Sequence, residues 1–227
     1  MQRLDKILSE AGVASRKELK TIIRAGRVSV NGSVIKDPEQ KFDETAAEIT
    51  VDGVSVRKKG TVLLMMHKPA GYVTSTDDPR DPTVMQLLPE EYLKLDVKPV
   101  GRLDKETEGL LLFTNDGDLA HRIISPKAGV WKTYYAEHVG RAENEDVEAF
   151  RRGIVLKDGT QCLPAELEPL GDGKSLIRVQ EGKYHQVRRM MASRDMTVQY
   201  LKRTGEGNLT LGTLAKGEIT EISPDQL

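Results

Sequence analysis

Residues 101–117 constrain the fold of this 227-residue chain more than any other segment. The segment contains an apolar run, residues 110–113, which is typical of a short buried strand. Ahead of this run lies a polar stretch in which Asp104 follows Arg102 and stands between Gly101 and Gly109. A group at the end of a buried strand is held rigidly by the scaffold. The segment therefore predicts a strand of a packed sheet with a reactive carboxylate just before it.

The sequence excludes several common classes of enzyme active site. No phosphate-binding P-loop, dinucleotide-binding glycine pattern or serine nucleophile elbow occurs. A lone carboxylate can attack an electron-poor carbon, and a nearby cation favours its ionised form. Most glycosidases use two carboxylates, and Asp104 has Glu106 and Glu108 nearby, but this short spacing is not suited to flanking a sugar. A glycosidase for small sugars is thus a distant alternative.

Composition narrows the class of protein. The chain is 38% hydrophobic and 30% charged, and its length favours one or two domains. Its longest apolar runs, residues 61–66 and 109–113, are too short to cross a membrane, and the N-terminus lacks a signal-peptide core. Cys162 is the only cysteine, so no internal disulfide can form, and we expect a cytoplasmic protein. The four histidines lack ligand spacing, so we expect no metal.

Two basic segments stand out on a chain whose net charge is −1. Residues 1–36 carry eight Lys/Arg against three acids, and residues 183–203 carry six against one, a net +5 for each. Residues 205–227 have a net charge of −3. Two basic segments suit a polyanion that is bound at two places. On charge alone, solvated faces explain them equally well.

The first 56 residues predict a small module of two helices and two hairpins. Apolar residues at helical spacing predict a helix ending at Gly12, and a capping-box pattern at Ser15 opens a second helix that Gly26 ends. Residues 28–35 alternate around an Asn-Gly pair and residues 48–56 around an Asp-Gly pair, which predicts two tight hairpins. Residues 57–60 have no apolar side chain and read as a linker.

This layout resembles the RNA-binding domain named after the small-subunit ribosomal protein S four. The resemblance covers about residues 2–48 and includes Arg3, Ser15-Arg16 and the Asn31-Gly32 turn. It implies that the basic side chains on and after the second helix contact RNA. We expect an RNA-binding domain at residues 1–57 and a second domain at residues 60–227.

Three motifs of the second domain resemble those of the pseudouridine synthases of the RsuA type. The first is Lys68-Pro69 with Gly71 and the loop that follows, which is closest to the small-subunit branch of the family. The second is the Asp104 segment. The third is residues 181–191, which we expect to open a helix. The implied fold is α+β: the small module, then a mixed, largely antiparallel β-sheet flanked by helices. The residue patterns themselves predict strands near residues 61–66, 132–136, 154–156, 165–168, 175–179, 198–203 and 209–211.

The resemblance implies isomerisation of a uridine in RNA, with no cofactor. Asp104 would detach uracil from its ribose, and C5 of the turned base would be joined to C1′. The uridine must leave its stack to reach such a pocket. Tyr134 would stack on the uracil and take up the C5 proton, and Arg188 would pair with Asp104. His185 would be a hydrogen-bonding support, and Leu201 would border the pocket.

The candidate residues for RNA contact come from both domains, with Lys68 and Arg102 weaker than the rest. They are Arg3, Arg16, Lys17, Lys20, Arg24, Arg27, Lys68, Arg102, Arg189 and Arg203. The implied partner is ribosomal RNA, with 16S favoured over 23S, either free or in a partly assembled small subunit. We expect a monomer. The alternative from another class is a non-catalytic ribosome-assembly factor, against which the set Asp104, Tyr134 and Arg188 argues.

Overall fold

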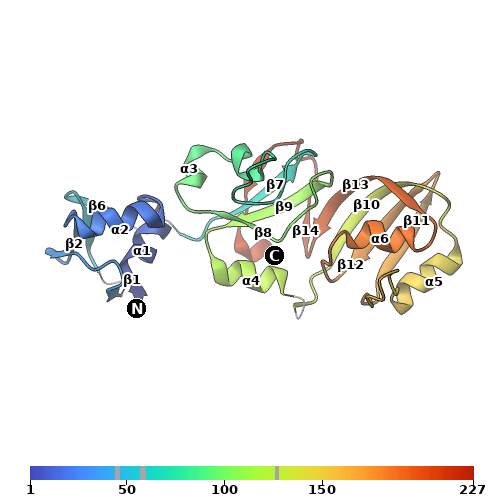
Figure 1. Ribbon diagram of the computed structural model, residues 1–227, viewed down its shortest axis with the longest axis horizontal. Coiled ribbons are helices and arrows are strands. Elements are labelled where there is room, and N and C mark those ends of the chain that lie inside the picture. Colours follow the sequence, from blue (N-terminus) through green and yellow to red (C-terminus); the bar gives the residue numbers. More distant parts are fainter. Residues whose placement is uncertain (44–46, 57–59, 126–127) are drawn as a thin grey trace. The chain divides into compact units, whose positions relative to one another are not determined.

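The computed structural model describes residues 1–43, 47–56, 60–125 and 128–227 (Figure 1). It divides into two compact units. The first comprises residues 1–62, 88–98 and 114–116, and the second comprises residues 63–87, 99–113 and 117–227. Residues 57–59 of the predicted linker lie outside the described residues, so a domain boundary there stays a prediction.

The first unit begins with the two predicted helices. They are α1 (Leu4–Glu10) and α2 (Arg16–Arg24). The predicted capping box is present, because the Ser15 side chain accepts from the Glu18 amide and the Glu18 carboxylate accepts from the Ser15 amide. The apolar faces of these two helices pack against the strands that come next in the chain, and together they form one core. Its buried members are Leu4, Ile7, Leu8, Leu19, Ile23, Val28, Val30 and Ile49.

A four-stranded sheet in the order β3-β2-β5-β6 completes this core. Its strands are β2 (Val28–Val30), β3 (Ser33–Ile35), β5 (Ile49–Val51) and β6 (Val54–Val56). Both predicted hairpins are confirmed, and their turn residues have the positive φ that a two-residue turn requires. A second pair, β1 (Gln2–Arg3) with β4 (Lys41–Phe42), and a short helix, α3 (Glu90–Leu93), were not predicted.

The second unit is built on a nine-stranded sheet in the order β11-β12-β10-β13-β9-β7-β15, with β14 beside β13 and β8 beside β9. The strands are β7 (Leu63–Lys68), β8 (Lys98–Val100), β9 (Glu108–Thr114), β10 (Lys132–Val139), β11 (Glu166–Gly171), β12 (Lys174–Val179), β13 (Thr197–Glu206), β14 (Leu209–Thr210) and β15 (Ile219–Glu221). Most neighbours are antiparallel, but β13 and β9 run parallel. The predicted α+β class with a mixed, largely antiparallel sheet is confirmed.

Helices pack on this sheet (Figure 1). The helices are α4 (Gly117–Ile124), α5 (Asn144–Arg152) and α6 (Gln186–Ala192). Leu119 and Ile123 of α4 join a core with buried residues of β7, β8, β9 and β14. Helix α5 packs on β11, and α6 packs on β13. Short 3-10 turns of this unit include Val84–Leu87 and Pro224–Gln226.

The parallel pairing of β9 with β13 depends on a glycine. Gly109 is in register with Arg203 and has a φ of +110°. A Cβ atom at this position would lie 2.1 Å from the main-chain oxygen of Arg203, far inside van der Waals contact. Only glycine lets the two backbones approach so closely. This approach brings the segment around Asp104 next to β13.

One predicted strand is wrong. Residues 154–156 form only an isolated bridge, between Val155 and Gln161, because the chain turns back within a few residues. Two strands of the sheet were missed. Strand β8 contains Pro99, which lacks an amide donor and argues against a strand, and β15 has only three residues.

Candidate active site

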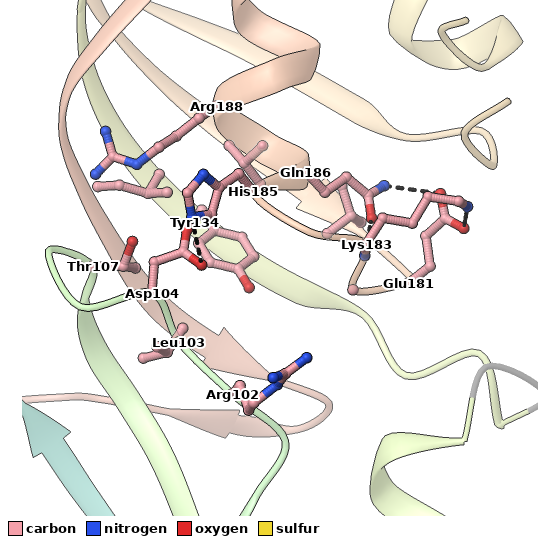
Figure 2. Close-up of a pocket in the computed structure, with 14 residues that line it drawn as sticks. Arg102, Leu103, Asp104, Thr107, Tyr134, Glu181, Lys183, His185, Gln186 and Arg188 are labelled. Carbon is pink, nitrogen blue, oxygen red and sulfur yellow. Dashed lines mark hydrogen bonds and ion pairs between the residues drawn. The ribbon is translucent and has the colours of Figure 1, made fainter. Parts of the chain in front are cut away.

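Asp104 lies in the turn segment between β8 and β9, on the wall of a pocket (Figure 2). Its side chain is 33% exposed, so the carboxylate can meet a ligand. Its main-chain oxygen accepts a hydrogen bond from the Thr107 amide at 3.0 Å, which closes the turn. Thr74 bonds both the amide and the carbonyl of Leu103 from the neighbouring loop. The carboxylate is thus exposed, while the backbone that carries it is held on both sides.

Lys68 holds this turn in place through hydrogen bonds from its buried side chain to main-chain oxygens. It ends β7, its residue is fully buried, and its ammonium donates to the main-chain oxygens of Pro69, Asp104, Lys105 and Thr107 at 2.9–3.2 Å. Burial lowers the pKa of this ammonium to about 8. Lys68 was predicted as one of the weaker candidates for RNA contact. Its complete burial excludes direct contact with RNA, which corrects that prediction.

Tyr134 faces the same pocket from β10 (Figure 2). Its side chain is buried, and burial raises the pKa of its phenol, an effect that the positive charge of Arg203 opposes. Tyr134 and Arg203 are paired in register across β10 and β13. Because burial raises the pKa of this phenol, it is neutral at physiological pH.

Arg203 is a correction to the predicted RNA contacts. Its side chain is only 2% exposed, and its Nε donates to the main-chain oxygen of Leu110 at 2.7 Å. Its Nη2 lies 3.2 Å from a carboxylate oxygen of Glu206, and the Lys132 ammonium lies 3.9 Å from the other oxygen. Arg203 thus belongs to a buried charged cluster behind Tyr134 and is not available to RNA.

Arg188 lines the pocket from α6, but it does not pair with Asp104 in this structure. Its Nη1 donates to the main-chain oxygen of Val198 at 3.1 Å. The side chain next to the carboxylate is His185, whose Nε2 lies 3.5 Å from Asp104 Oδ1 (Figure 2). The sequence placed His185 in the third motif as a support, but nothing in the sequence indicated that an imidazole would take the predicted place of the guanidinium.

The turn ahead of α6 forms another wall of the pocket. The Gln186 amide group donates to Glu181 at 2.9 Å, and the Gln186 side-chain oxygen accepts from the Lys183 amide. Lys183 also forms an ion pair with Glu181. These residues lie in the predicted third motif, but their mutual bonds depend on the shape of the turn and were not foreseen.

The remaining predicted site residues of this unit differ in burial and in whether they line the pocket. Leu201 is buried and lines the pocket, as predicted. Arg102 is exposed and lines the pocket as well. Arg189 does not line it, and its Nη2 lies 2.5 Å from Asp158, while its Nη1 donates to the main-chain oxygen of Tyr184.

The predicted basic residues of the first unit are of two kinds. Arg3 is paired with Asp5 and Glu39, and Arg27 is paired with Asp52. The others lie exposed on α2, and no described ion pair neutralises them. They are Arg16, Lys17, Lys20 and Arg24.

The described part of the chain holds neither a metal cluster nor a membrane-spanning helix. No group of three or more His, Cys, Asp or Glu side chains there has the arrangement of a metal site. No helix among the described residues is long and apolar enough to span a membrane.

Comparison with known proteins extends over the whole chain. Residues 62–193 match the family described as RNA pseudouridylate synthase, and residues 2–47 match the S4 domain. An uncharacterized RNA pseudouridine synthase of Bacillus subtilis, YtzG, is 40% identical and aligns with 99% of this chain and 96% of its own length.

Two further relatives are named for different ribosomal subunits. The ribosomal small subunit pseudouridine synthase A of Vibrio cholerae is 37% identical, over 99% of this chain and 97% of that protein. The ribosomal large subunit pseudouridine synthase B of Bacillus subtilis is 34% identical, over 100% of this chain and 94% of that protein.

A solved structure agrees with these matches. The crystal structure of a pseudouridylate synthase superposes with a TM-score of 0.70 at 32% identity, covering 100% of this chain and 98% of that chain. The chain therefore belongs to the RNA pseudouridylate synthase family, carries an S4 domain ahead of the catalytic unit, and is an isomerase that acts on RNA.

Proposed function

We propose that this protein converts a uridine of ribosomal RNA to pseudouridine, with 16S RNA as the substrate and Asp104 as the nucleophile. The observation that carries the proposal is the partly exposed Asp104 carboxylate, which shares a pocket with the buried phenol of Tyr134. A carboxylate fixed on a rigid turn can attack a carbon that an extruded nucleotide presents to it.

The proposed reaction needs no redox partner. Asp104 attacks C1′ of the ribose, and the C1′–N1 bond breaks with its electron pair on uracil. The detached base turns within the pocket, and its C5 attacks C1′ and displaces the carboxylate. The C5 proton then leaves, N1 gains a proton, and the product is an isomer of the substrate.

Tyr134 is the proposed partner for these protons. Because burial raises the pKa of its phenol, Tyr134 holds its proton at neutral pH. A neutral phenol can take up the C5 proton only if it passes its own proton on, and N1 is the group that requires one. Tyr134 would therefore act as a relay and offer its ring as a stacking face for uracil.

Arg188 has a supporting part in this proposal. Its guanidinium lines the same pocket as Asp104. The hydrogen bond from Arg188 to the main-chain oxygen of Val198 has an uncharged acceptor, which the charged oxygens of a bound RNA phosphate or of Asp104 could replace. Arg102, exposed at the pocket, is proposed to contact the RNA backbone.

The proposed division of labour follows the two domains at residues 1–57 and 60–227. The exposed cations of α2 would hold folded RNA by its phosphates while the pocket receives the uridine. We propose a monomer, acting in the cytoplasm where ribosomal RNA is made and assembled, on free RNA or on a partly assembled small subunit. Sedimentation of the pure protein, and its activity on both kinds of substrate, would test these points.

The choice of subunit rests on two observations. The loop after Lys68 resembles the small-subunit branch, and a small-subunit enzyme is 37% identical over almost the whole chain. The large-subunit enzyme at 34% identity makes 23S RNA the second candidate.

The test is to map pseudouridines in ribosomal RNA from cells with and without the gene. One pseudouridine in 16S RNA should be lost, and wild-type protein but not the Asp104→Asn variant should restore it. Loss of a 23S pseudouridine instead would reassign the substrate. Unchanged RNA modification, together with assembly defects that the Asp104→Asn variant repairs, would favour the non-catalytic assembly factor.

A further inference from the structure

Tyr184 presents an aromatic ring to solvent at the edge of the catalytic pocket. Its relative exposure is 76%, and it belongs to the turn ahead of α6. A single exposed apolar side chain is ordinary on a protein surface. Tyr184 differs because of what lies on the other face of its ring.

That other face is covered by His185. The two ring centroids are 3.9 Å apart and the ring planes differ by 17°, so the rings are stacked. His185 itself lines the pocket, and its Nε2 lies 3.5 Å from Asp104 Oδ1. Asp104, His185 and Tyr184 thus form a continuous row, and the outer ring face of Tyr184 is exposed.

The backbone of this turn holds the row in place. His185 has φ 47° and ψ 35°, in the left-handed region that residues with a side chain rarely adopt. Around it, the Lys183 amide donates to the Gln186 side chain, and the Gln186 amide donates to the Lys183 main-chain oxygen. A conformation of this kind is retained only where its surroundings impose it, and it is what turns His185 toward Asp104.

A cation lies beside the row. Arg189 donates to the main-chain oxygen of Tyr184 at 3.3 Å, pairs with Asp158 through its Nη2, and keeps 31% of its side chain exposed. It belongs to the basic segment 183–203, whose net charge is +5. An open aromatic face with a neighbouring guanidinium matches the chemistry of single-stranded RNA, in which bases stack on aromatic rings and phosphates pair with cations.

We infer that the outer face of Tyr184 is a stacking subsite for an unpaired nucleobase of the substrate RNA, next in the chain to the uridine in the pocket. This inference rests on the proposed function. Extruding a uridine breaks its stacking with its neighbour, and the Tyr184–His185 pair offers that neighbour a replacement surface. The subsite therefore contributes to substrate binding, and Tyr184 takes no part in bond making.

The first test compares Tyr184→Ala and Tyr184→Phe on ribosomal RNA from cells that lack the gene. Stacking of one base on an aromatic ring corresponds to roughly a 5- to 150-fold change in affinity. Tyr184→Ala should raise KM by about tenfold and leave kcat within about twofold, and Tyr184→Phe should match wild type. Leu170→Ala, which removes another exposed apolar side chain, is the matched control. A KM for Tyr184→Ala equal to that of the control would overturn the subsite.

The second test does not depend on turnover. The Asp104→Asn variant is bound to the same RNA and irradiated with ultraviolet light, and cross-linked peptides are identified by mass spectrometry. The subsite predicts a cross-link from Tyr184 or His185 to a nucleotide adjacent to the uridine that wild-type enzyme converts. Cross-links only to distant nucleotides, or none from this turn, would refute it.

The two tests separate this inference from the proposed function. If wild-type protein forms no pseudouridine in ribosomal RNA, the proposed function fails. If wild-type protein does form it, and either the KM test or the cross-link test gives the contrary result, the subsite alone is wrong.

Discussion

The ammonium of Lys68 lies 3.2 Å from the main-chain oxygen of Asp104, and it bonds three other carbonyls of the two loops that meet there. A lysine at the end of a buried strand thus determines where the candidate nucleophile stands. Its bonds reach the backbone, so they set the position of Asp104 and leave its carboxylate free.

Replacing Lys68 should therefore impair the chemical step. Lys68→Met keeps a long side chain but removes the ammonium that donates to four carbonyl oxygens. A displacement of about 1 Å at a reacting group can cost roughly 10²-fold in rate, so we expect kcat to fall by about that factor with little change in RNA affinity. Single-turnover assays measure this. Lys105→Met, which removes an exposed lysine paired with Asp81, is the control and should retain most activity.

The pKa of Lys68 predicts how stability depends on pH. Burial lowers this pKa from its usual 10.5 to about 8. Between these two values the unfolded chain holds a proton that the folded chain has released, so this group makes the free energy of unfolding rise with pH. Urea unfolding at about pH 7 and about pH 9.5 should show wild type gaining stability relative to Lys68→Met. A relative loss would mean that the four carbonyls favour the ammonium more than burial penalises it.

Asp104→Asn should abolish isomerisation and leave RNA binding intact. The amide is nearly the same size, and the backbone bonds that hold the turn do not involve the side chain, but an amide is a far weaker nucleophile. We expect a rate loss of at least about 10³-fold. Binding of ribosomal RNA should stay within roughly twofold, because phosphate contacts dominate affinity. Loss of binding in this variant would make Asp104 a structural residue.

Arg203 should contribute to the stability of the fold rather than to RNA binding. Arg203→Met leaves Glu206 buried without its closest cation and should lower the free energy of unfolding by about 3 kcal/mol. The double variant Arg203→Met with Glu206→Leu removes both charges, and it should recover much of the loss. Thermal and urea unfolding measure both. A single variant as stable as wild type would show that the buried pair is dispensable.

The exposed cations of α2 predict a salt-dependent RNA affinity. Replacing Lys17, Lys20 and Arg24 with glutamine should weaken binding of ribosomal RNA and reduce the slope of log affinity against log salt by roughly one for each phosphate that no longer meets a cation. The matched control changes Arg152, Lys157 and Lys174, which are equally exposed in the other unit. Equal effects of both sets would show that α2 has no special part in binding.

Much of the fold followed from local patterns. The capping box at Ser15, the Asn-Gly and Asp-Gly turns, and the apolar runs of β7 and β9 each depend on residues close in sequence, and the structure confirms all of them. The strand predicted at residues 154–156 failed because three apolar residues do not reveal whether a partner strand is available. Strand β8 was missed because its pairing with β9 overrides the unfavourable proline.

The sequence by itself determined the types of groups in the pocket and the two elements at its centre. Asp104 precedes one strand and Tyr134 lies within another, and the residue patterns predict both strands. Only the tertiary structure decided which of the predicted cations are exposed and which are buried in the fold. A sequence does not distinguish a buried lysine or arginine from an exposed one, because the role of each depends on burial and on partners distant in the chain. Arg203 and Lys68 are enclosed by strands and carbonyls, His185 reaches Asp104 through a left-handed turn, and Arg188 bonds the main chain. Such contacts form only when the sheet closes, so no local pattern records them.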